Sequence, residues 1–370
     1  MQDNPQWPSG VGRCGLGRGI MAKSVLRRAW PEGHVPLLSV AGTPYEAGVQ
    51  LGYAWKEAFY HVARNWPPNT RPWWMDRRYA RLISRHAPHL PDLYRGMAKG
   101  AGVPEKRLSD PAPGGTPSLA EEPGGCTSFA VHPTTTLDGI PISGQTKDTG
   151  SQQQFRFVVL RLQLRGAPSA LTLTYPGLLF GHGFVAGGCS LFRNSLFAGS
   201  AEKGLPAHVW GLLALHCTTA EAAGEIALRY GIQGGGHYTI ADAKGGIVGV
   251  EWGQGGVAIL RPKRGIYTHA NAVVSGARLR RYEKGGSWGP LNSLQRQTRL
   301  RQRLEADRGR LTAQLAFMAL CDHVRYPRSI CRHESLDALT TAAVVVEPTR
   351  GLLHATRGAP CMNWPKTYAL

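Results

Sequence analysis

The strand-like segments of this chain come in blocks separated by pairs of helix-like segments, and this order constrains the fold more than any other feature. From residue 126 on, one block of strands precedes two helices, a second block precedes two more, and two strands close the chain. Strict strand–helix alternation would favour a parallel sheet, whereas such blocks favour antiparallel sheets. We therefore predict an α+β fold of stacked layers, with helices on both outer faces of two packed, mainly antiparallel sheets.

The first 105 residues are mostly helix-like. Thr43, Pro44 and Glu46 begin one helix, because Thr43 can cap it, Pro44 suits its first position and Glu46 its third. Further helices are predicted at residues 75–86 and 90–102. The stretch 107–125 is rich in proline, glycine and acidic residues, and we interpret it as an exposed linker.

These patterns divide the chain into three segments. Residues 1–34 form an N-terminal extension that we expect to be partly disordered. Residues 35–125 form a helical segment that ends in the linker, and residues 126–370 form a strand-rich segment. We expect the last two segments to form one domain.

The chain is strongly basic, with a formal charge of +19 and a pI near 10.0. Such a charge raises the hypothesis of a nucleic-acid partner. The basic residues do not form one tract, however, and we interpret the densest stretch, residues 277–304, as partly helical with its arginines on a solvent-exposed face. A non-catalytic nucleic-acid-binding module stays an alternative, and a solvated surface or attraction to acidic small molecules is favoured.

Several classes of site lack their sequence signals. No apolar run is long enough to span a bilayer, and the N-terminus has no apolar signal-peptide core, so we expect a cytoplasmic location. The seven cysteines include no CxxC pair, and the chain has no HExxH or GxxxxGK[ST] motif. We therefore expect no disulfide framework, no metal and no cofactor.

Cys126 has an unusual position, where the linker meets the first residue of a predicted buried strand. It directly follows Gly124 and Gly125. Because glycine has no side chain, the preceding peptide could adopt backbone angles that bring the thiol to the Gly125 carbonyl. Attack there, followed by hydrolysis, would leave Cys126 as a new N-terminus whose α-amino group can act as base for its own thiol. An ordinary buried cysteine is the alternative.

The junction has the sequence GGCTSFAV (124–131), and six further segments add to it. They are GTPYEAGVQLG (42–52), LPDLYRGMAKGAGV (90–103), GQTKD (144–148), GIYTHAN (265–271), YPRSICR (326–332) and RGAPCMN (357–363). In this order they resemble the isopenicillin-N acyltransferase-like family of self-processing cysteine N-terminal-nucleophile (Ntn) hydrolases, over residues 35 to 370. The resemblance implies a four-layer αββα sandwich, the Ntn-hydrolase fold, and an inactive precursor that is cleaved between Gly125 and Cys126.

The resemblance also implies roles for single residues. Cys126 matches the nucleophile that carries an acyl group, and Asp148 matches an aspartate needed near it. Asn271 matches an asparagine of the oxyanion hole, a donor that contributes about 3 kcal/mol to transition-state stabilisation. A salt bridge at the hairpin end for Asp148 and a turn cap for Asn271 are the structural alternatives. Cys331 and Arg332 match a segment that we interpret as structural support.

The chain departs from the family pattern in two places. Where the family has an asparagine after a glycine-rich segment, this chain has His182, and an arginine ahead of the penultimate strand has no counterpart near Thr340. The specificity of the fungal acyltransferase is therefore not transferred. His182, His269 and Glu251 are possible pocket residues, although a loop position for His182 or an exposed strand position for Glu251 would need no function.

The leading hypothesis is a self-activating cysteine amidohydrolase that cuts a linear carboxamide through an acyl-enzyme on Cys126. The alternative within the same family is an acyltransferase of secondary metabolism that passes an acyl group from a CoA or carrier-protein thioester to an amine. In both, the partners are a small-molecule amide or acyl donor and the two chains of the processed precursor. No membrane partner is expected.

Overall fold

The computed structural model describes residues 34–65, 72–108, 125–284, 289–333 and 339–370. The chain divides into two compact units, Met1–Pro31 and Glu32–Leu370. The first unit and most of the predicted linker lie outside the described residues, so the account below concerns the second unit.

Two sheets form the centre of this unit, one of eight strands and one of six, and only the pair β1–β4 is parallel among the described strand pairs. In spatial order the eight-stranded sheet contains β1 (Leu37–Gly42), β4 (Val158–Leu164), β5 (Ala170–Thr174), β6 (His182–Val185), β7 (Cys189–Asn194), β8 (Gly236–Asp242), β9 (Ile247–Gly253) and β10 (Gly256–Leu260). The six-stranded sheet contains β11 (Ile266–His269), β2 (Gly125–Val131), β3 (Ile142–Thr149), β12 (Leu339–Glu347), β13 (Leu352–Arg357) and β14 (Lys366–Ala369). The predicted α+β class with two mainly antiparallel sheets is confirmed.

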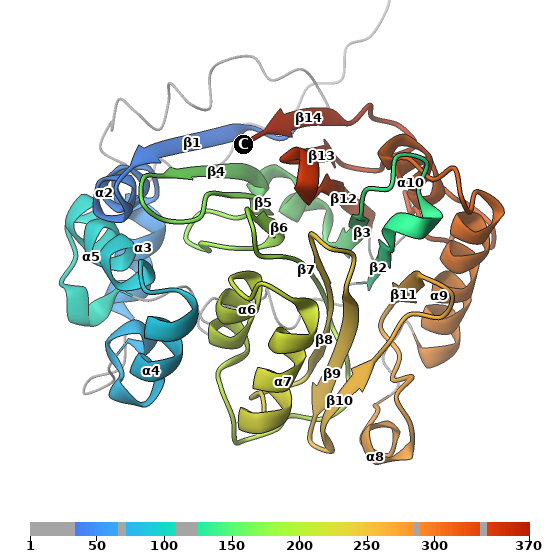
Figure 1. Ribbon diagram of the computed structural model, residues 1–370, viewed down its shortest axis with the longest axis horizontal. Coiled ribbons are helices and arrows are strands. Elements are labelled where there is room, and N and C mark those ends of the chain that lie inside the picture. Colours follow the sequence, from blue (N-terminus) through green and yellow to red (C-terminus); the bar gives the residue numbers. More distant parts are fainter. Residues whose placement is uncertain (1–33, 66–71, 109–124, 285–288, 334–338) are drawn as a thin grey trace, which may run out of the picture. The chain divides into compact units, whose positions relative to one another are not determined.

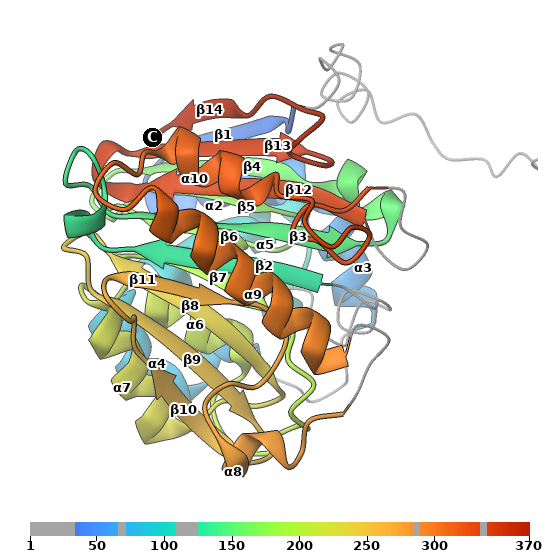
Figure 2. The ribbon, with the colours of Figure 1, turned by 90° about the vertical axis from the view of Figure 1, so that its right-hand side faces the viewer.

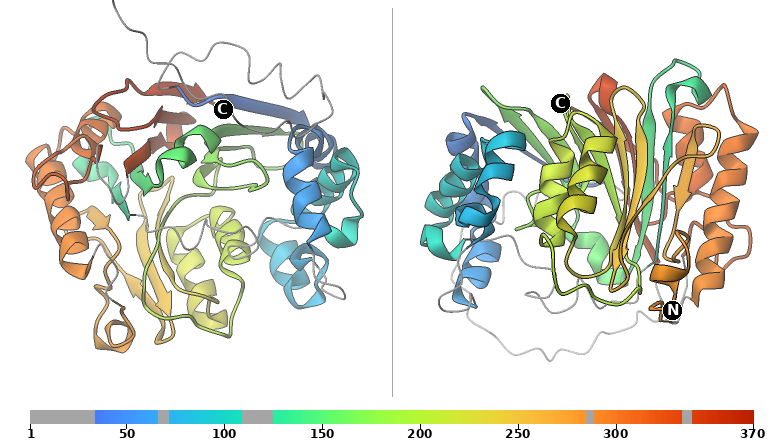
Figure 3. Two further views of the ribbon diagram at one scale, coloured as in Figure 1. Left: turned by 180° about the vertical axis from the view of Figure 1, so that it is seen from behind. Right: turned by 60° about the horizontal axis from the view of Figure 1, so that its bottom comes forward.

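Helices cover the outer faces of both sheets. Helices α6 (Ala207–Leu215) and α7 (Ala220–Tyr230) pack on the eight-stranded sheet, and α9 (Gly289–Ala306) and α10 (Ala313–Leu320) lie across the six-stranded sheet (Figure 2). The right-hand view of Figure 3 shows the two helix pairs on opposite sides of the strands. The remaining helices are α2 (Pro44–Ala54), α3 (Lys56–Arg64), α4 (Arg77–His86) and α5 (Leu90–Ala101), which gather near β1 in Figure 1, and the short α8 (Ala277–Arg280). The layer order helix, sheet, sheet, helix is the predicted one.

The signals at the first helix act as predicted. The Thr43 side chain accepts a hydrogen bond from the Glu46 N–H, and the Glu46 carboxylate accepts one from the Thr43 N–H, which completes a capping box. The predicted single helix nevertheless breaks at Trp55, so that α2 and α3 are separate. Gly102 ends α5 with a φ of 69°, a conformation that glycine adopts without strain.

Strand β12 shows how the two sheets share one core. Val344 and Val346 point into a cluster with residues of the eight-stranded sheet, while Ala343 and Val345 point toward α9 and α10. Successive side chains of a strand alternate between faces, so a strand covered on both sides is apolar at every position. This explains the uninterrupted run AAVVV in the sequence.

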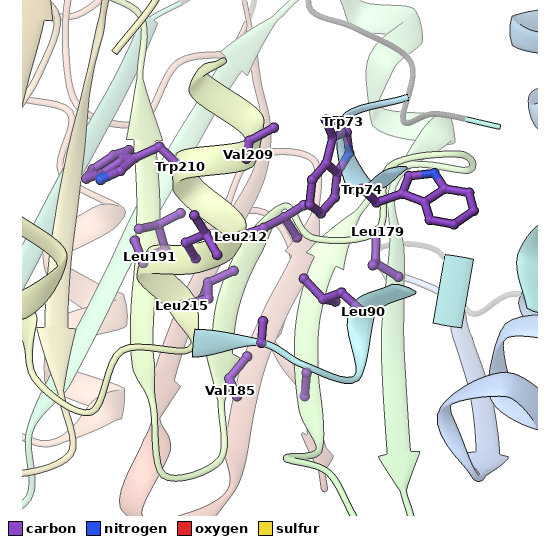
Figure 4. Packing of buried hydrophobic residues seen from close by; sticks show 14 of the residues in the cluster. Trp73, Trp74, Leu90, Leu179, Val185, Leu191, Val209, Trp210, Leu212 and Leu215 are labelled. Carbon is purple, nitrogen blue, oxygen red and sulfur yellow. The ribbon is translucent and has the colours of Figure 1, made fainter. Parts of the chain in front are cut away.

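A second core lies between the eight-stranded sheet and the helices outside it. Figure 4 shows Val209, Leu212 and Leu215 of α6 near Leu191 of β7, with Leu90 of α5 close by. Trp73 and Trp74 complete this part of the cluster, and all these residues are buried. The N-terminal helices therefore belong to the same core as strands that lie beyond residue 126.

Two strands were not predicted. The segment around His182, expected as a glycine-rich loop, forms β6, and the C-terminal residues Lys366–Ala369 form β14. Both are four residues long, too short to produce a clear alternating pattern. No helix among the described residues is long and apolar enough to cross a membrane, and the cytoplasmic location remains a prediction.

Candidate active site around Cys126

The hairpin β2–β3 places Cys126, as the sequence predicted. The two strands pair antiparallel, with Gly125 opposite Asp148 and Cys126 opposite Lys147. Gly139, in the predicted turn, has a φ of 65°. Because side chains alternate, Cys126 shares with Ser128 the face toward the eight-stranded sheet, where Ser128 Oγ bonds to side chains of β7 and β8. Cys126 therefore begins a buried strand, with its thiol on the inner face.

Polar side chains from four elements hold the main chain and thiol of Cys126. Its N–H donates to Asn271 Oδ1 at 2.9 Å, and Lys147 Nζ donates to its Sγ at 3.3 Å. Its carbonyl accepts from Asn194 Nδ2 at 3.1 Å and from Arg296 Nη1 at 2.9 Å. The residue is only 3% exposed, so these bonds lie almost wholly out of water.

Asp148 lies beside the backbone that precedes Cys126. Its Oδ1 accepts from Thr340 Oγ1 at 2.8 Å, while its buried Oδ2 has no hydrogen-bond partner among the described residues. A β-carbon added at Gly125 would lie 2.8 Å from this Oδ2. As register partner of Gly125, Asp148 points to the opposite face from the Cys126 thiol. The carboxylate is thus placed to act on the peptide between residues 125 and 126.

The charge of Asp148 depends on two opposing effects. Complete burial raises the pKa of its carboxyl group, and the guanidinium groups of Arg332 and Arg296 oppose that rise. Arg332 Nε lies 3.6 Å from Asp148 Oδ2, with both side chains fully buried. The carboxylate therefore has an unsatisfied acceptor atom in a cationic surrounding, which suits it to receive a further hydrogen-bond donor.

Asn271, just after β11, faces Cys126 with its oxygen. Its Oδ1 accepts from the Cys126 N–H and from Arg296 Nη2 at 2.8 Å, and its Nδ2 donates to the Ser195 carbonyl at 2.9 Å. If the amide were flipped, its NH2 group would face the Cys126 N–H and Arg296 Nη2, which are both donors. The amide oxygen must therefore lie on this side. In the uncleaved chain Asn271 accordingly acts as an acceptor toward the Cys126 N–H, and its oxyanion role stays a prediction.

Arg296 is a site residue that the sequence interpretation missed. The stretch 277–304, predicted to be partly helical, contains most of α9, but the expectation that its arginines cover a solvent-exposed face is wrong for Arg296, which is 1% exposed. Its guanidinium contacts Cys126, Thr127 and Asn271. A signal existed: Arg296 lies four residues before Leu300, which in turn lies four before Leu304, on one buried helix face.

Asn194 and Lys147 were also missed. Asn194, the last residue of β7, binds the Cys126 carbonyl, although the expected segment around His182 has no asparagine. Nothing local marks it, because its position depends on how the two sheets pack. Lys147 could have been found from the hairpin register, since it lies directly opposite Cys126.

His269 and Glu251, two possible pocket residues, form a fully buried pair. His269 Nε2 lies 2.7 Å from Glu251 Oε1, and the carboxylate also accepts from the backbone N–H groups of Val274 and Ser275. Burial alone would raise the pKa of Glu251, but these hydrogen bonds outweigh it and lower the pKa. The alternative of an exposed strand glutamate is wrong. The pair secures the segment that carries Asn271.

His237 lies between this pair and Asn194, which binds the Cys126 carbonyl. Its ring stacks on His269 with centroids 3.5 Å apart, its Nδ1 lies 3.2 Å from Asn194 Oδ1, and its Nε2 lies 2.8 Å from the Tyr267 hydroxyl. Because Asn194 donates its amide N–H to Cys126, its oxygen must accept, so His237 Nδ1 carries the proton. Burial and the neighbouring His269 lower the pKa of His237, which fits a neutral ring.

His182 lies on β6, with its Nδ1 accepting a long bond of 3.4 Å from the Arg193 N–H. Burial lowers the pKa of its ring well below the ordinary range, and the cation of Lys147 contributes to this shift. The same lysine contacts the Cys126 thiol, so His182 lies on the nucleophile's side of the site. Its pocket role stays a prediction.

A cluster of potential metal ligands lies in the described part of the chain, formed by residues other than those around Cys126. One ligand atom each from His323, His333 and Cys361 lie within 4.8 Å of one another.

Comparison with known proteins gives structural similarities only. No protein-family model matches the chain, and no curated protein matches it. Two solved structures of variants of conjugated bile acid hydrolase from Clostridium perfringens have TM-scores of 0.45 and 0.46 at 14% and 15% identity, each covering 66% of this chain and 97% of that one. Penicillin V acylase from Agrobacterium tumefaciens has a TM-score of 0.43 at 12% identity, over 62% of this chain and 82% of that one.

Proposed function

We propose that this protein is a self-activating cysteine amidohydrolase, in which Cys126 becomes an N-terminal nucleophile after the Gly125–Cys126 bond is cut. The observation that supports this most is the set of bonds to one residue: Asn271 binds its N–H, Asn194 its carbonyl, and Lys147 its Sγ. The N–H and carbonyl of any buried residue need partners, but a cysteine that only fills space does not need an amino group on its sulfur. Such close positioning is what a nucleophile requires.

The processing step uses the atoms at the start of β2. Cys126 Sγ attacks the Gly125 carbonyl carbon, the bond from that carbon to the Cys126 nitrogen breaks, and a thioester and a free α-amine form. Water then hydrolyses the thioester to a Gly125 carboxylate and the free thiol. The unpartnered Oδ2 of Asp148 and the Oδ1 of Asn271 would both accept hydrogen bonds from the new amino group.

Cleavage of a separate amide substrate would follow the same chemistry as cleavage of the chain. The α-amino group takes the proton of the thiol, and the ammonium group of Lys147 stabilises the thiolate. Sγ attacks the substrate carbonyl, the amine leaves with a proton, and water releases the acid from Cys126. Asn271 Nδ2 has two N–H groups, of which Ser195 binds one, so the second remains for the oxyanion.

The two products, residues 1–125 and 126–370, would stay associated. Strand β1 pairs with β4 across the proposed cut, and helices on both sides of the cut contribute to the core drawn in Figure 4. Separation would expose this apolar surface to water. We therefore propose the processed enzyme as a two-chain unit with a small-molecule amide as its substrate.

The test is hydrolysis of acyl p-nitroanilides of increasing acyl length by the purified, processed protein. We expect p-nitroaniline release together with an acyl adduct on residue 126 in intact-mass spectra. Cys126→Ala should abolish both, and Cys189→Ala, at a buried cysteine of β7, should preserve both. A processed wild type that neither releases p-nitroaniline nor accepts the acyl group would overturn the proposal.

The same assay distinguishes the acyltransferase alternative. Added primary amines should leave the rate of acid formation nearly unchanged if water is the acceptor. A transferase would instead form the acylated amine in preference to the acid. An uncleaved chain retained by nucleic acid at low salt and released by salt would support the binding-module alternative.

A further inference from the structure

Two Cys-x-His segments and one distant cysteine meet beside the six-stranded sheet. Cys321 and His323 follow α10, Cys331 and His333 come ten residues later, and Cys361 follows β13. The Cys331 N–H donates to the Asp322 carbonyl at 3.1 Å, which holds the two segments side by side. None of these residues has a part in the proposed hydrolysis.

The donor atoms face one another. His323 Nε2 and His333 Nε2 are 3.1 Å apart, and Cys331 Sγ and Cys361 Sγ are 3.5 Å apart. The two histidine rings stand nearly perpendicular, at 82°, so that they converge at their edges. Cys361 joins the histidine pair, because the three ligand atoms of His323, His333 and Cys361 lie within 4.8 Å of one another.

The separation of the two histidine nitrogens matches one edge of a tetrahedron around zinc. Zinc–nitrogen bonds of about 2.05 Å give edges of about 3.3 Å between nitrogens, and the observed separation is 3.1 Å. Cys361 Sγ lies within 4.8 Å of both nitrogens. Two imidazoles and one thiolate, with a fourth position open, are ligands that suit Zn²⁺.

We propose that His323, His333 and Cys361 bind one Zn²⁺ ion, with the Cys331 thiol 3.5 Å from Cys361 Sγ but outside this set of three ligand atoms. Cys321 is left outside the set, because its Sγ donates to the Phe317 carbonyl at 3.5 Å. Cys361 is exposed and Cys331 is buried, so the ion would enter from the Cys361 side.

The sequence expectation of no metal rested on the lack of a CxxC or HExxH motif. Here the ligands are brought together by tertiary structure from three segments, which no single motif reveals.

The ion would also fix Arg332, which directly precedes its ligand His333 in sequence. The Arg332 side chain reaches Asp148, 3.6 Å away, and donates to Asn292 Oδ1 at 2.8 Å. The zinc proposal does not rest on the proposed function, and its readouts are independent of hydrolysis.

The test measures metal in protein purified under reducing conditions from medium supplied with zinc. We expect about one zinc per chain in the full-length wild type. Organomercurial titration with a colorimetric zinc indicator should release that zinc in proportion to the cysteines modified. Cobalt substituted for zinc should give the visible absorption of a tetrahedral cobalt–thiolate centre.

Variants locate the ion. Cys361→Ser and His333→Ala should lose most of the zinc, and His61→Ala, at an exposed histidine of α3, should keep it. Far-ultraviolet circular dichroism checks that each variant folds. A folded wild type without stoichiometric zinc, a Cys331–Cys361 disulfide in its place, or full zinc content in Cys361→Ser would each overturn the proposal. The organomercurial titration of the wild-type protein tests the proposal even if a variant does not fold.

Discussion

Asp148 lies directly across the β2–β3 ladder from Gly125, and its Oδ2 would be 2.8 Å from any β-carbon at that position. Its side chain and the Cys126 thiol point to opposite faces of the sheet. The Asp148 carboxylate therefore lies beside the main chain at the proposed cut, whereas Lys147 contacts the sulfur on the inner face. We therefore expect substitutions beside Asp148 to affect chain cleavage, and substitution of Lys147 to affect the reactivity of the thiol.

Gly125→Ala should slow chain cleavage. The new methyl group must displace Asp148, which Thr340 and Arg332 hold in a buried position, at a cost of about 1–3 kcal/mol. Such a cost in the transition state at the reacting peptide corresponds to a loss of rate of roughly 5- to 150-fold. The fraction of uncut chain on denaturing gels over time measures it. The matched control is Gly224→Ala in α7, where the nearest atom is 3.3 Å away; cleavage slowed equally by both substitutions would contradict the role of Asp148.

Lys147→Met should make the Cys126 thiol less reactive. Lys147 Nζ donates to Sγ at 3.3 Å and can stabilise negative charge that develops on the sulfur as it attacks. We expect alkylation by iodoacetamide near pH 7 to slow about tenfold in the processed protein. Peptide mass spectrometry of residue 126 follows the reaction, with Lys244→Met in the β8–β9 turn as control. An unchanged rate for Lys147→Met would show that the ammonium does not act on the sulfur.

Arg296→Lys should impair activity despite keeping the charge. The planar guanidinium binds the Cys126 carbonyl, Thr127 Oγ1 and Asn271 Oδ1 together, which a single ammonium cannot do. We expect amide hydrolysis to fall about 100-fold, with a folded protein by circular dichroism. Arg303→Lys, on a part-exposed face of the same helix, should have wild-type rates. Equal rates for both variants would place Arg296 outside the machinery.

Glu251→Gln should destabilise the protein in a pH-dependent way. Because folding lowers the pKa of Glu251 below its ordinary 4.5, the folded state binds fewer protons than the unfolded state in that range. The stabilisation is full above about pH 4.5 and is lost as the pH falls through the folded pKa. We expect the free energy of unfolding, measured with urea at pH 7, to be about 2 kcal/mol lower for the variant than for the wild type. The difference should shrink below pH 4.5, and a difference that stayed constant would contradict the lowered pKa of Glu251 in the folded protein.

Features that depend only on residues close together in sequence were predicted. The capping box at Thr43, the hairpin that carries Cys126 and the C-cap at Gly102 follow from neighbouring residues alone. The meeting of Cys126 and Asn271 was expected only through a family resemblance. It is realised because β11 pairs with β2, which places His269 opposite Ser128.

Other parts depend on packing between distant elements. Asn194 reaches Cys126 because β7 packs against β2, and a strand-end asparagine in isolation looks like a turn residue. Arg296 carries a charge, so a charge-based interpretation placed it in solvent, while its buried helix face was visible only from the spacing to Leu300. The metal-ligand cluster combines segments up to Cys361 that no local pattern joins.

The central claim is that Cys126 becomes a chain end, and intact-mass spectrometry with N-terminal sequencing of the purified protein tests it most directly. The account predicts two fragments, residues 1–125 and 126–370, the second beginning Cys-Thr-Ser-Phe, and a single uncut chain for Cys126→Ala. A wild-type protein that hydrolyses amides while its chain remains continuous through residues 125 and 126 would contradict the account.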